Sequence, residues 1–245
     1  MSTLLLRLAA PMQSWGLSSR FKYLTTEREP TKSGVVGMLA AALGRERDAD
    51  LSDLTQLGFG VRIDQPGEFL QDFHTAHSFD SKQAFISYRH YLCDAVFIVG
   101  LESDDKVLLS RIEEALRHPR FPLYLGRRAC PPAGQLVLSL EELPLEEALR
   151  QVPWQAAKWY QRKLRREKKP ELDLIIDAPF GTQGSFTRRD LPLSFDPEHR
   201  RYGFRSLCAS INAIPVKNPQ WRDSDSSSAV GRETEQDPLS ALEVD

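Results

Sequence analysis

Lys32 and Ser33 stand where a phosphate-binding group would be expected, at the start of the predicted helix PTKSGVVGMLAAALG (30–44). Thr31 or Ser33 can cap its first turn, and Gly44 can end it in the left-handed conformation. A lysine, a hydroxyl group and free backbone N–H groups at the positive end of a helix dipole suit a phosphate. The stretch therefore predicts either a phosphate site or an ordinary capped helix packed through its apolar face.

A second candidate for phosphate contact is the sequence YLGRRACPP at 124–132. Gly126 permits a tight turn, and the consecutive residues Arg127 and Arg128 would project on opposite sides of it. Arginine binds phosphate through two parallel hydrogen bonds and also stacks on bases. We expect Arg127, Arg128 and Lys32 to form one site, although they are far apart in the sequence. A purely structural turn is the alternative.

The long loop PMQSWGLSSRFKYLTTERE at 11–29 mixes aromatic and basic residues. Long loops in compact domains are usually functional or disordered, and aromatic residues argue against disorder. Trp15 and Arg20 could stack on a base and neutralise a phosphate of a single-stranded nucleic acid. The alternative is that Trp15 and Phe21 fold back onto the hydrophobic core.

Candidates for metal binding or acid–base catalysis cluster only in DFHTAH at 72–77. On a strand, Asp72 and His74 would share one face and His77 would not. The sequence has no GxSxG, HExxH or paired-carboxylate motif, and its three cysteines are widely spaced without a CxxC pair. We therefore expect no metal, no cofactor and no catalytic residue, and a reducing, cytoplasmic environment.

A basic run occupies PWQAAKWYQRKLRREKK at 153–169. Trp154, Ala157, Tyr160 and Leu164 would share one face of a helix, while lysines and arginines fill the rest. Such a run is usually a solvated face, and the alternative is contact with nucleic acid. Because the net charge of the chain is −2, any nucleic-acid site has to be a local patch of this kind.

The composition is that of a globular protein, with 41% hydrophobic and 27% charged residues in a chain of 245. No apolar run approaches the ~20 residues that span a bilayer, so no membrane contact is expected. Apolar periodicity predicts the order strand, helix, two strands, helix, strand, followed by a region with a short helix and further strands. The expected strands are 3–9, 58–63, 69–75, 91–101, 135–140, 172–178, 191–195 and 202–214, and the two longer helices are 30–44 and 106–118.

This order is the ferredoxin-like or RRM-like βαββαβ arrangement of an α+β domain, whose open sheet face often binds RNA. We expect this domain at 1–140, with an exposed finger at about 76–90. A smaller, mainly β C-terminal unit is expected at 141–215 and an acidic, disordered tail at 216–245. The RRM signature itself is absent, so the fold alone does not establish RNA binding.

Four motifs, LLLRLAAPMQSWG, PTKSGVVGMLAAALG, YLCDAVF and LYLGRRACPP, resemble in order and spacing the CasD family, the fifth class of CRISPR-associated proteins, in its subtype I-E form. The resemblance covers nearly all of 1–215. It implies a non-catalytic subunit of the Cascade complex that grips the 5′ handle of the CRISPR RNA and caps the filament of backbone subunits. It also implies contact with the large subunit, contact with target DNA only through the complex, and a finger that acts as a thumb on the guide.

The residues expected to bind RNA come from the first loop, the helix entrance, the finger and the arginine turn: Ser14, Trp15, Arg20, Lys32, Ser33, Tyr88, Arg89, Tyr124, Gly126, Arg127 and Arg128. Two alternatives stay open. In subtype I-C the related protein cuts the precursor RNA with a Tyr, Lys and His set, and His74 and His77 keep such cleavage open here. The other alternative is a free-standing RNA-binding module that works outside any complex.

Overall fold

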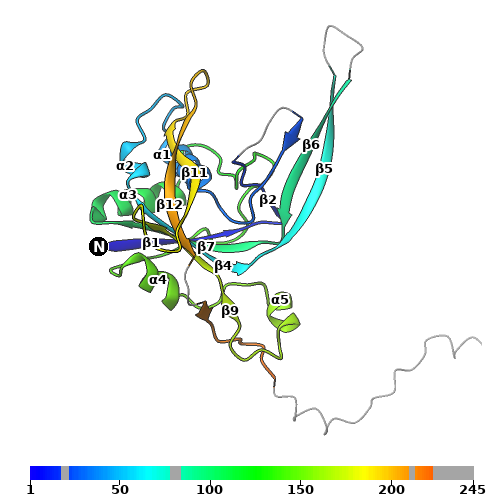
Figure 1. Cartoon of the computed structure of the whole chain (residues 1–245), viewed down its shortest axis with the longest axis vertical. Helices are drawn as coiled ribbons and strands as arrows, with labels where there is room; N and C mark the ends of the chain where they lie inside the picture. Colours follow the sequence, from blue (N-terminus) through cyan, green and yellow to red (C-terminus); the bar gives the residue numbers. More distant parts are fainter. Residues whose placement is uncertain (18–21, 78–83, 210–212, 223–245) are drawn as a thin grey trace, which may run out of the picture.

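The computed structural model describes residues 1–17, 22–77, 84–209 and 213–222. It is an α+β protein with a seven-stranded antiparallel sheet in the order β11-β12-β10-β4-β7-β1-β8 (Figure 1). The strands of this sheet are β1 (Ser2–Ala9), β4 (Gly58–Gln65), β7 (Val96–Ser103), β8 (Val137–Glu141), β10 (Leu174–Ala178), β11 (Phe186–Ser194) and β12 (Arg201–Ala209).

Helices cover both faces of this sheet. They are α1 (Lys32–Leu43), α2 (Ser52–Thr55), α3 (Lys106–Arg117), α4 (Leu145–Gln151) and α5 (Lys158–Lys163). In Figure 1, α1 and α3 lie on one side of β1 and β7, and α4 lies on the other. Within the described residues, no helix is long and apolar enough to cross a membrane.

Strand β1 separates two hydrophobic cores because its side chains alternate between the faces of the sheet. Leu4, Leu6 and Leu8 belong to the core beneath α1 and α3. Leu5 belongs to the second core, which contains Leu149 of α4 and other residues of the C-terminal part of the chain. The sheet is therefore buried on both faces, which explains why β1 reads as a continuous apolar run.

Helix α1 has the caps that the sequence predicts. The Thr31 hydroxyl accepts a hydrogen bond from the Gly34 N–H at 3.2 Å, and Gly44 ends the helix with φ +76°. The Gly44 N–H donates to the carbonyls of Ala40 and Ala41, as expected for a left-handed cap. Helix α1 therefore starts and ends at locally encoded positions.

One predicted strand, 91–101, is wrong as a single element. The chain turns at Asp94, a non-glycine residue with φ +55°, so that the run divides into the end of β6 (Ala84–Cys93) and the start of β7. Strand β6 belongs to a different sheet from β7. Continuous hydrophobicity does not reveal this break, because both strands are buried on either side of it.

The second sheet forms a hairpin that projects from the body of the protein (Figure 1). Strand β5 (Glu68–His77) pairs with β6 along its whole length, and β2 (Met12–Gln13) and β3 (Tyr23–Leu24) pair with the other edge of β6. The hairpin contains the predicted finger but begins earlier in the sequence. Residues 78–83 of the predicted finger lie outside the described part of the chain.

Strands from the C-terminal part continue the main sheet. Strand β10 pairs with β4, and β12 pairs with both β10 and β11. The sheet is thus continuous across the predicted boundary at residue 140, and the division into domains stays a prediction. The predicted strand 202–214 is shorter than expected, because β12 ends at Ala209.

Residues 216–222 of the predicted tail are folded onto the protein. Strand β13 (Ile214–Pro215) pairs with β9 (Glu171–Leu172), and the residues that follow are also folded onto the protein. Val216 and Asn218 are buried, with 6% and 3% of their surface exposed. The rest of the predicted tail, residues 223–245, lies outside the described residues.

Candidate functional site

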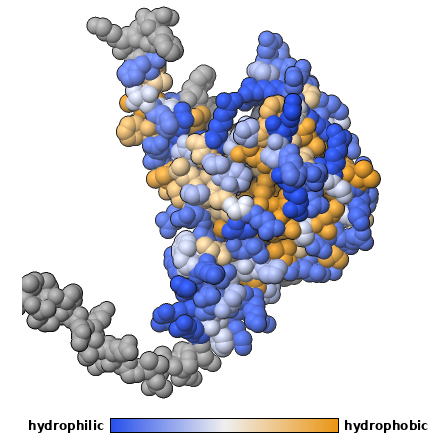
Figure 2. Space-filling model, turned by 180° about the vertical axis from the view of Figure 1, so that it is seen from behind, coloured by the Kyte–Doolittle hydropathy of each residue, from blue (hydrophilic) through white to orange (hydrophobic). Residues whose placement is uncertain are grey.

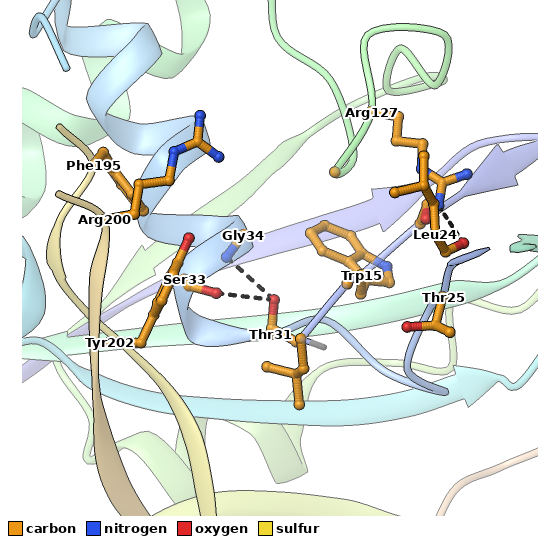
Figure 3. Close-up of a pocket in the computed structure, with 14 residues that line it drawn as sticks. Trp15, Leu24, Thr25, Thr31, Ser33, Gly34, Arg127, Phe195, Arg200 and Tyr202 are labelled. Atoms are coloured by element: carbon orange, nitrogen blue, oxygen red, sulfur yellow. Dashed lines mark hydrogen bonds between the residues drawn. The ribbon is translucent and has the colours of Figure 1, made fainter. Parts of the chain in front are cut away.

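A pocket of about 440 Å³ lies at the N-terminal end of α1 (Figure 3). We call it the α1 pocket. Besides the start of α1, four segments supply its walls: the loop after β2, the residues around β3, the turn with Gly126 and Arg127, and the β11–β12 connection with the first residues of β12. Its lining residues are Ser14, Trp15, Gly16, Leu17, Leu24, Thr25, Thr31, Ser33, Gly34, Gly126, Arg127, Phe195, Arg200 and Tyr202.

Gly126 fixes the position of the turn at 124–132, which contains Arg127 and Arg128 and which we call the arginine turn. Its φ is +86°, and a Cβ atom at this position would lie 1.5 Å from the backbone oxygen of Ser14. The Ser14 N–H donates to the Leu125 carbonyl at 3.1 Å, and the Cys130 N–H donates to the Arg127 carbonyl at 2.8 Å. The turn is therefore clamped against the first loop, and only glycine allows this approach.

This clamp places Arg127 in the wall of the α1 pocket. Its guanidinium carbon lies 4.7 Å from the centre of the Tyr91 ring, and its Nη2 donates to the Leu24 carbonyl at 2.7 Å. Its Nη1 atom is buried and has no hydrogen-bond partner among the described residues. Thr25, another lining residue, has a buried hydroxyl that also lacks a partner within this part of the chain. Buried polar atoms are rarely left unpaired, so these two groups beside one pocket are candidates for contact with a ligand.

The first two residues of α1 point to different places: Ser33 lines the α1 pocket, and Lys32 is buried in the protein. Ser33 lines the α1 pocket, and its hydroxyl lies 3.4 Å from the Thr31 hydroxyl. Lys32 does not line it: the Lys32 Nζ donates to Asp177 at 2.9 Å and to the Leu57 carbonyl at 2.7 Å. The Lys32 backbone N–H donates to Asp190 at 2.9 Å. The expectation that Lys32 holds a phosphate is corrected, because two of the chain's own carboxylates already bind this residue.

These carboxylates belong to a buried ionic network that joins α1 to the C-terminal strands. Arg205 donates to Asp190 at 2.6 and 2.8 Å and also pairs with Asp177. Burial lowers the pKa of Arg205, but hydrogen bonds to Asp190 and the charges of both aspartates raise it overall. With Lys32, the network contains two cations and two anions, so it is neutral and internally satisfied. Its role is to hold β10, β11 and β12 against the start of α1.

Trp15 and Ser14 form the floor of the pocket. The Trp15 ring is fully buried, its Nε1 donates to Gln13 at 3.1 Å, and a Cβ atom on Gly34 would lie 2.8 Å from it. Trp15 therefore lies in the core, as the alternative expects, and a buried ring offers no face to a base. Phe21, the other residue of that alternative, lies outside the described residues. The Ser14 hydroxyl donates to the His90 carbonyl at 3.1 Å.

The other predicted residues lie around the pocket. Tyr88 on β6 stacks on Tyr23, with ring centres 5.2 Å apart, and neighbouring Arg89 has a buried Nε without a partner in the described part of the chain. Tyr124 and Arg128 are exposed but do not line the pocket. Arg20 lies outside the described residues.

Sequence reasoning missed the wall that the β11–β12 connection contributes. Phe195, Arg200 and Tyr202 line the pocket opposite Trp15 and Arg127 (Figure 3). Arg200 is exposed and makes no ion pair with any described residue. The dipeptide Arg200–Arg201 beside a turn was a local signal, but nothing in the sequence places this turn over α1.

The histidine cluster makes a small surface pair. The His74 Nε2 lies 3.0 Å from the Asp72 Oδ2, and about half of each side chain is exposed. Among the described residues, no group of three or more His, Cys, Asp or Glu side chains is placed to hold a metal ion.

The fold and the pocket together define an α+β protein with a cationic and aromatic pocket, a surface suited to ligands that contain phosphate. A family model described as "CRISPR-associated protein (Cas_Cas5)" matches residues 3–208. The match covers most of the chain, and the chain therefore belongs to this family.

Individual relatives agree with this membership. The chain is 38% identical, over 158 residues, to a protein of Escherichia coli (strain K12) named "CRISPR system Cascade subunit CasD", covering 56% of this chain and 70% of that protein. A solved structure described as "CRISPR RNA-guided surveillance complex" contains a chain with 33% identity and a TM-score of 0.70, covering 87% of this chain and 91% of the other. Another, described as "Crystal structure of Cas protein", has 38% identity and a TM-score of 0.67, covering 89% and 99%.

Proposed function

We propose that this chain is a subunit of a Cascade complex and that its α1 pocket binds the 5′ handle of the CRISPR RNA. The observation that carries the proposal is Arg127, which lines the α1 pocket and whose buried Nη1 has no hydrogen-bond partner among the described residues. A phosphate or a base carbonyl in the pocket would accept this hydrogen bond and remove the cost of leaving it unmade. Arg200 and Tyr202 on the opposite wall add a second cation and an aromatic ring.

The geometry favours a single strand. A pocket of about 440 Å³ has room for a nucleotide but not for a duplex, and unstacked bases are what proteins recognise in single-stranded RNA. The Arg127 guanidinium already lies over the Tyr91 ring, so its plane is fixed before any ligand binds. Of the residues that the sequence predicts to bind RNA, we propose that the following also lie in or beside the binding site: Ser14, Ser33, Tyr88, Arg89, Tyr124, Gly126 and Arg128.

The names of the relatives support the assignment to Cascade. The partners we propose are the CRISPR RNA, the backbone subunits, the large subunit and other Cascade subunits, with target DNA met through the complex. We further propose that β1, α1, β4, β7, α3 and β8 form the ferredoxin-like arrangement, because their strand order is β8-β1-β7-β4 and all pairs are antiparallel. The β5–β6 hairpin is then an insertion between its second and third strands, and it would act as the thumb.

We propose that the protein does not cut RNA. The Asp72–His74 pair is exposed to solvent, so nothing excludes water or holds a reacting group in place. The subtype I-C alternative would need a base positioned beside the scissile phosphate. The free-standing module remains the other alternative, and it predicts RNA binding without co-purification of other subunits.

The experiment is to measure binding of CRISPR repeat RNA to the purified full chain as a function of salt. Arg127→Ala should lower the salt slope by about 0.7, the value for one phosphate contact on a single strand. Arg127→Lys should also bind more weakly, because lysine lacks the planar fork. Arg111→Ala, which removes an exposed arginine from α3, is the matched control and should bind normally.

Normal affinity and salt slope in both Arg127 variants, with normal thermal stability, would rule out the site. The same samples report on catalysis when the RNA is run on a denaturing gel with and without divalent metal. Discrete cleavage that His74→Ala abolishes would favour the nuclease alternative.

A further inference from the structure

A dense group of positive charges lies far from the α1 pocket, on α5 and the loop that follows it. We call this group the basic ridge: Lys158, Arg162, Lys163, Arg165, Arg166, Lys168 and Lys169. All seven side chains are exposed, and within the described residues none of them forms an ion pair with a carboxylate. Glu167 is the single acidic residue between positions 158 and 169. The ridge therefore carries a local charge that its own surroundings do not neutralise.

The ridge is held in a fixed shape from behind. The side-chain amide of buried Asn218 lies 3.2, 2.8 and 3.2 Å from the carbonyl oxygens of Gln161, Leu164 and Glu167. The Arg222 N–H donates to the Arg165 carbonyl at 3.1 Å. A solvated charge run needs no such support. Fixing this backbone in place reduces the entropy lost when a ligand binds to it.

A second pocket of about 480 Å³ adjoins the ridge. Its lining residues are Arg7, Gln135, Leu138, Trp154, Gln155, Ala156, Lys158, Gln161, Pro219 and Gln220. Arg7 is half-buried, and its guanidinium has no hydrogen-bond or ion-pair partner among the described residues. Glutamine and arginine side chains recognise the edges of bases. The Nε2 atoms of Gln135, Gln155 and Gln161 already donate to backbone carbonyls, at 2.8, 3.1 and 3.0 Å, so we assign base contact to their amide oxygens and to Arg7. Lys158 belongs to both the pocket and the ridge.

An exposed aromatic ring completes this surface. Trp159 is 53% exposed, and it follows Lys158 at the start of α5. A tryptophan beside lysines and arginines is the combination that holds single strands, because bases stack on the ring while cations contact the phosphates. Strongly hydrophilic residues cover the lower end of the molecule in Figure 2, where Figure 1 places α5.

This surface is separate from the α1 pocket. Tyr160 and Leu164, which anchor the ridge, pack against the core that contains Leu5 and Leu149. Trp15, on the floor of the α1 pocket, belongs to the core on the opposite face of the sheet. One short strand of nucleic acid cannot occupy both positions without passing around the edge of the sheet.

We propose that the basic ridge and the Arg7 pocket form a second nucleic-acid-binding site, which takes a single strand by its phosphodiester backbone and stacks a base on Trp159. The ligand chemistry is a phosphodiester chain with unpaired bases, which either DNA or RNA can supply. An acidic protein segment is the competing ligand. It is less suited, because it has no base to place on Trp159 or among the amides of the pocket.

The test uses the full chain and fluorescently labelled 12-nucleotide dT, 12-nucleotide U and a 12-base-pair DNA duplex. The ridge variant is Arg165→Ala/Arg166→Ala, and the control is Arg47→Ala/Arg111→Ala, which removes two exposed arginines elsewhere. Loss of two phosphate contacts should lower the salt slope by about 1.4 and weaken single-strand binding about 25-fold at 0.1 M salt. Trp159→Ala should weaken binding of single strands by about fivefold or more and leave duplex binding unchanged.

Further measurements separate this site from the proposed handle site. The ridge variant should cause the same loss in an Arg127→Ala background, where the α1 pocket is already impaired. Comparison of dT with U decides whether DNA or RNA is preferred. Equal effects of the ridge and control variants would overturn the proposal, and so would tighter binding of duplex than of single strands. Ridge-dependent binding of a peptide with the sequence 223–245, in place of the oligonucleotides, would also overturn it.

Discussion

Arg127 and Lys32 have the same charge but different surroundings. Lys32 is 5% exposed and bonded to Asp177, whereas the Arg127 guanidinium has a buried N–H group that no described residue pairs with. A paired cation contributes to folding, and an unpaired one lowers stability until a ligand arrives. At the residue scale, the buried Nη1 of Arg127 is thus the group that we propose for contact with RNA, and Lys32 is not.

Replacement of Lys32 tests this distinction. Lys32→Met should lower the free energy of unfolding by about 3 kcal/mol, because Asp177 and Asp190 would then share only Arg205. Urea denaturation measures the loss. Arg45→Met, which breaks the more exposed pair with Asp53, is the control and should cost less than about 1 kcal/mol. A stable Lys32→Met protein with a reduced RNA salt slope would restore the phosphate role of this residue.

Gly126 and Gly181 provide a matched pair of glycines. Both have φ +86°, but a Cβ atom on Gly126 would meet the Ser14 oxygen at 1.5 Å, and one on Gly181 would meet nothing within 4 Å. Gly181→Ala should therefore cost about 1 kcal/mol for backbone strain alone. Gly126→Ala should cost about 1 to 3 kcal/mol more, because the first loop must move.

Unfolding in urea measures both glycine variants. Because Gly126 holds the arginine turn in place, RNA affinity should fall with stability in Gly126→Ala and stay normal in Gly181→Ala. Equal losses of stability in the two variants would contradict the clamped geometry of the turn.

At the scale of elements, the β5–β6 hairpin is notable for the apolar surface that it exposes. It exposes several large apolar side chains, which Figure 2 shows as orange patches on the projecting arm. These residues are Phe69, Leu70, Phe73, Phe85 and Ile86. Exposed aromatic residues on a rigid element commonly anchor protein interfaces.

Shortening the hairpin tests this role. Replacing residues 76–85 with an Asn-Gly turn keeps the cross-strand pair of Thr75 and Ile86. The protein should fold normally, because the described residues of the removed segment, 76, 77, 84 and 85, belong to neither core. Co-purification with the adjacent backbone subunit should be lost, and Phe73→Ser should weaken it. Val107→Ser, which alters an exposed apolar residue on α3, is the control. Normal assembly of the shortened protein would refute the thumb assignment.

At the scale of the whole molecule, residues 213–222 pack against the rest of the protein. Val216 is buried, and the Asn218 amide binds carbonyl groups of α5 and the following loop. The C-terminal strands also supply Asp190 and Arg205, which orient the start of α1. The α1 pocket therefore depends on residues from the N-terminal part of the chain and on strands β11 and β12.

Two truncations measure where the fold ends. A chain that ends at Arg222 should keep the stability, assembly and RNA affinity of the full chain, because the acidic residues removed have little apolar content to pack. A chain that ends at Pro215 should unfold at a lower temperature, because it exposes three carbonyl groups that Asn218 satisfies. Thermal unfolding and RNA binding of both proteins show which of these C-terminal residues contribute to stability and to RNA affinity. Loss of assembly in the longer chain would show a role for 223–245.

The sequence by itself determined what depends on neighbours along the chain. Helix α1 has its predicted caps, Thr31 and Gly44, because a cap is a hydrogen bond within one turn. Strand β1 follows from a short, continuous apolar run, and helix α3 follows from apolar residues at helical spacing. The arginine turn was also predictable, since Gly126 is the residue that a turn with positive φ requires. The four family motifs are also short runs of consecutive residues, so the sequence alone reveals them.

Only the tertiary structure decided what depends on segments that are distant in sequence. It assigned Lys32 to Asp177 instead of to a ligand, and it placed Arg200 in the pocket wall. It also broke the apolar run at Asp94 between two sheets. Charge and hydrophobicity are properties of single residues, but whether a cation is paired or a strand is shared depends on long-range packing. Local sequence patterns do not encode those partners.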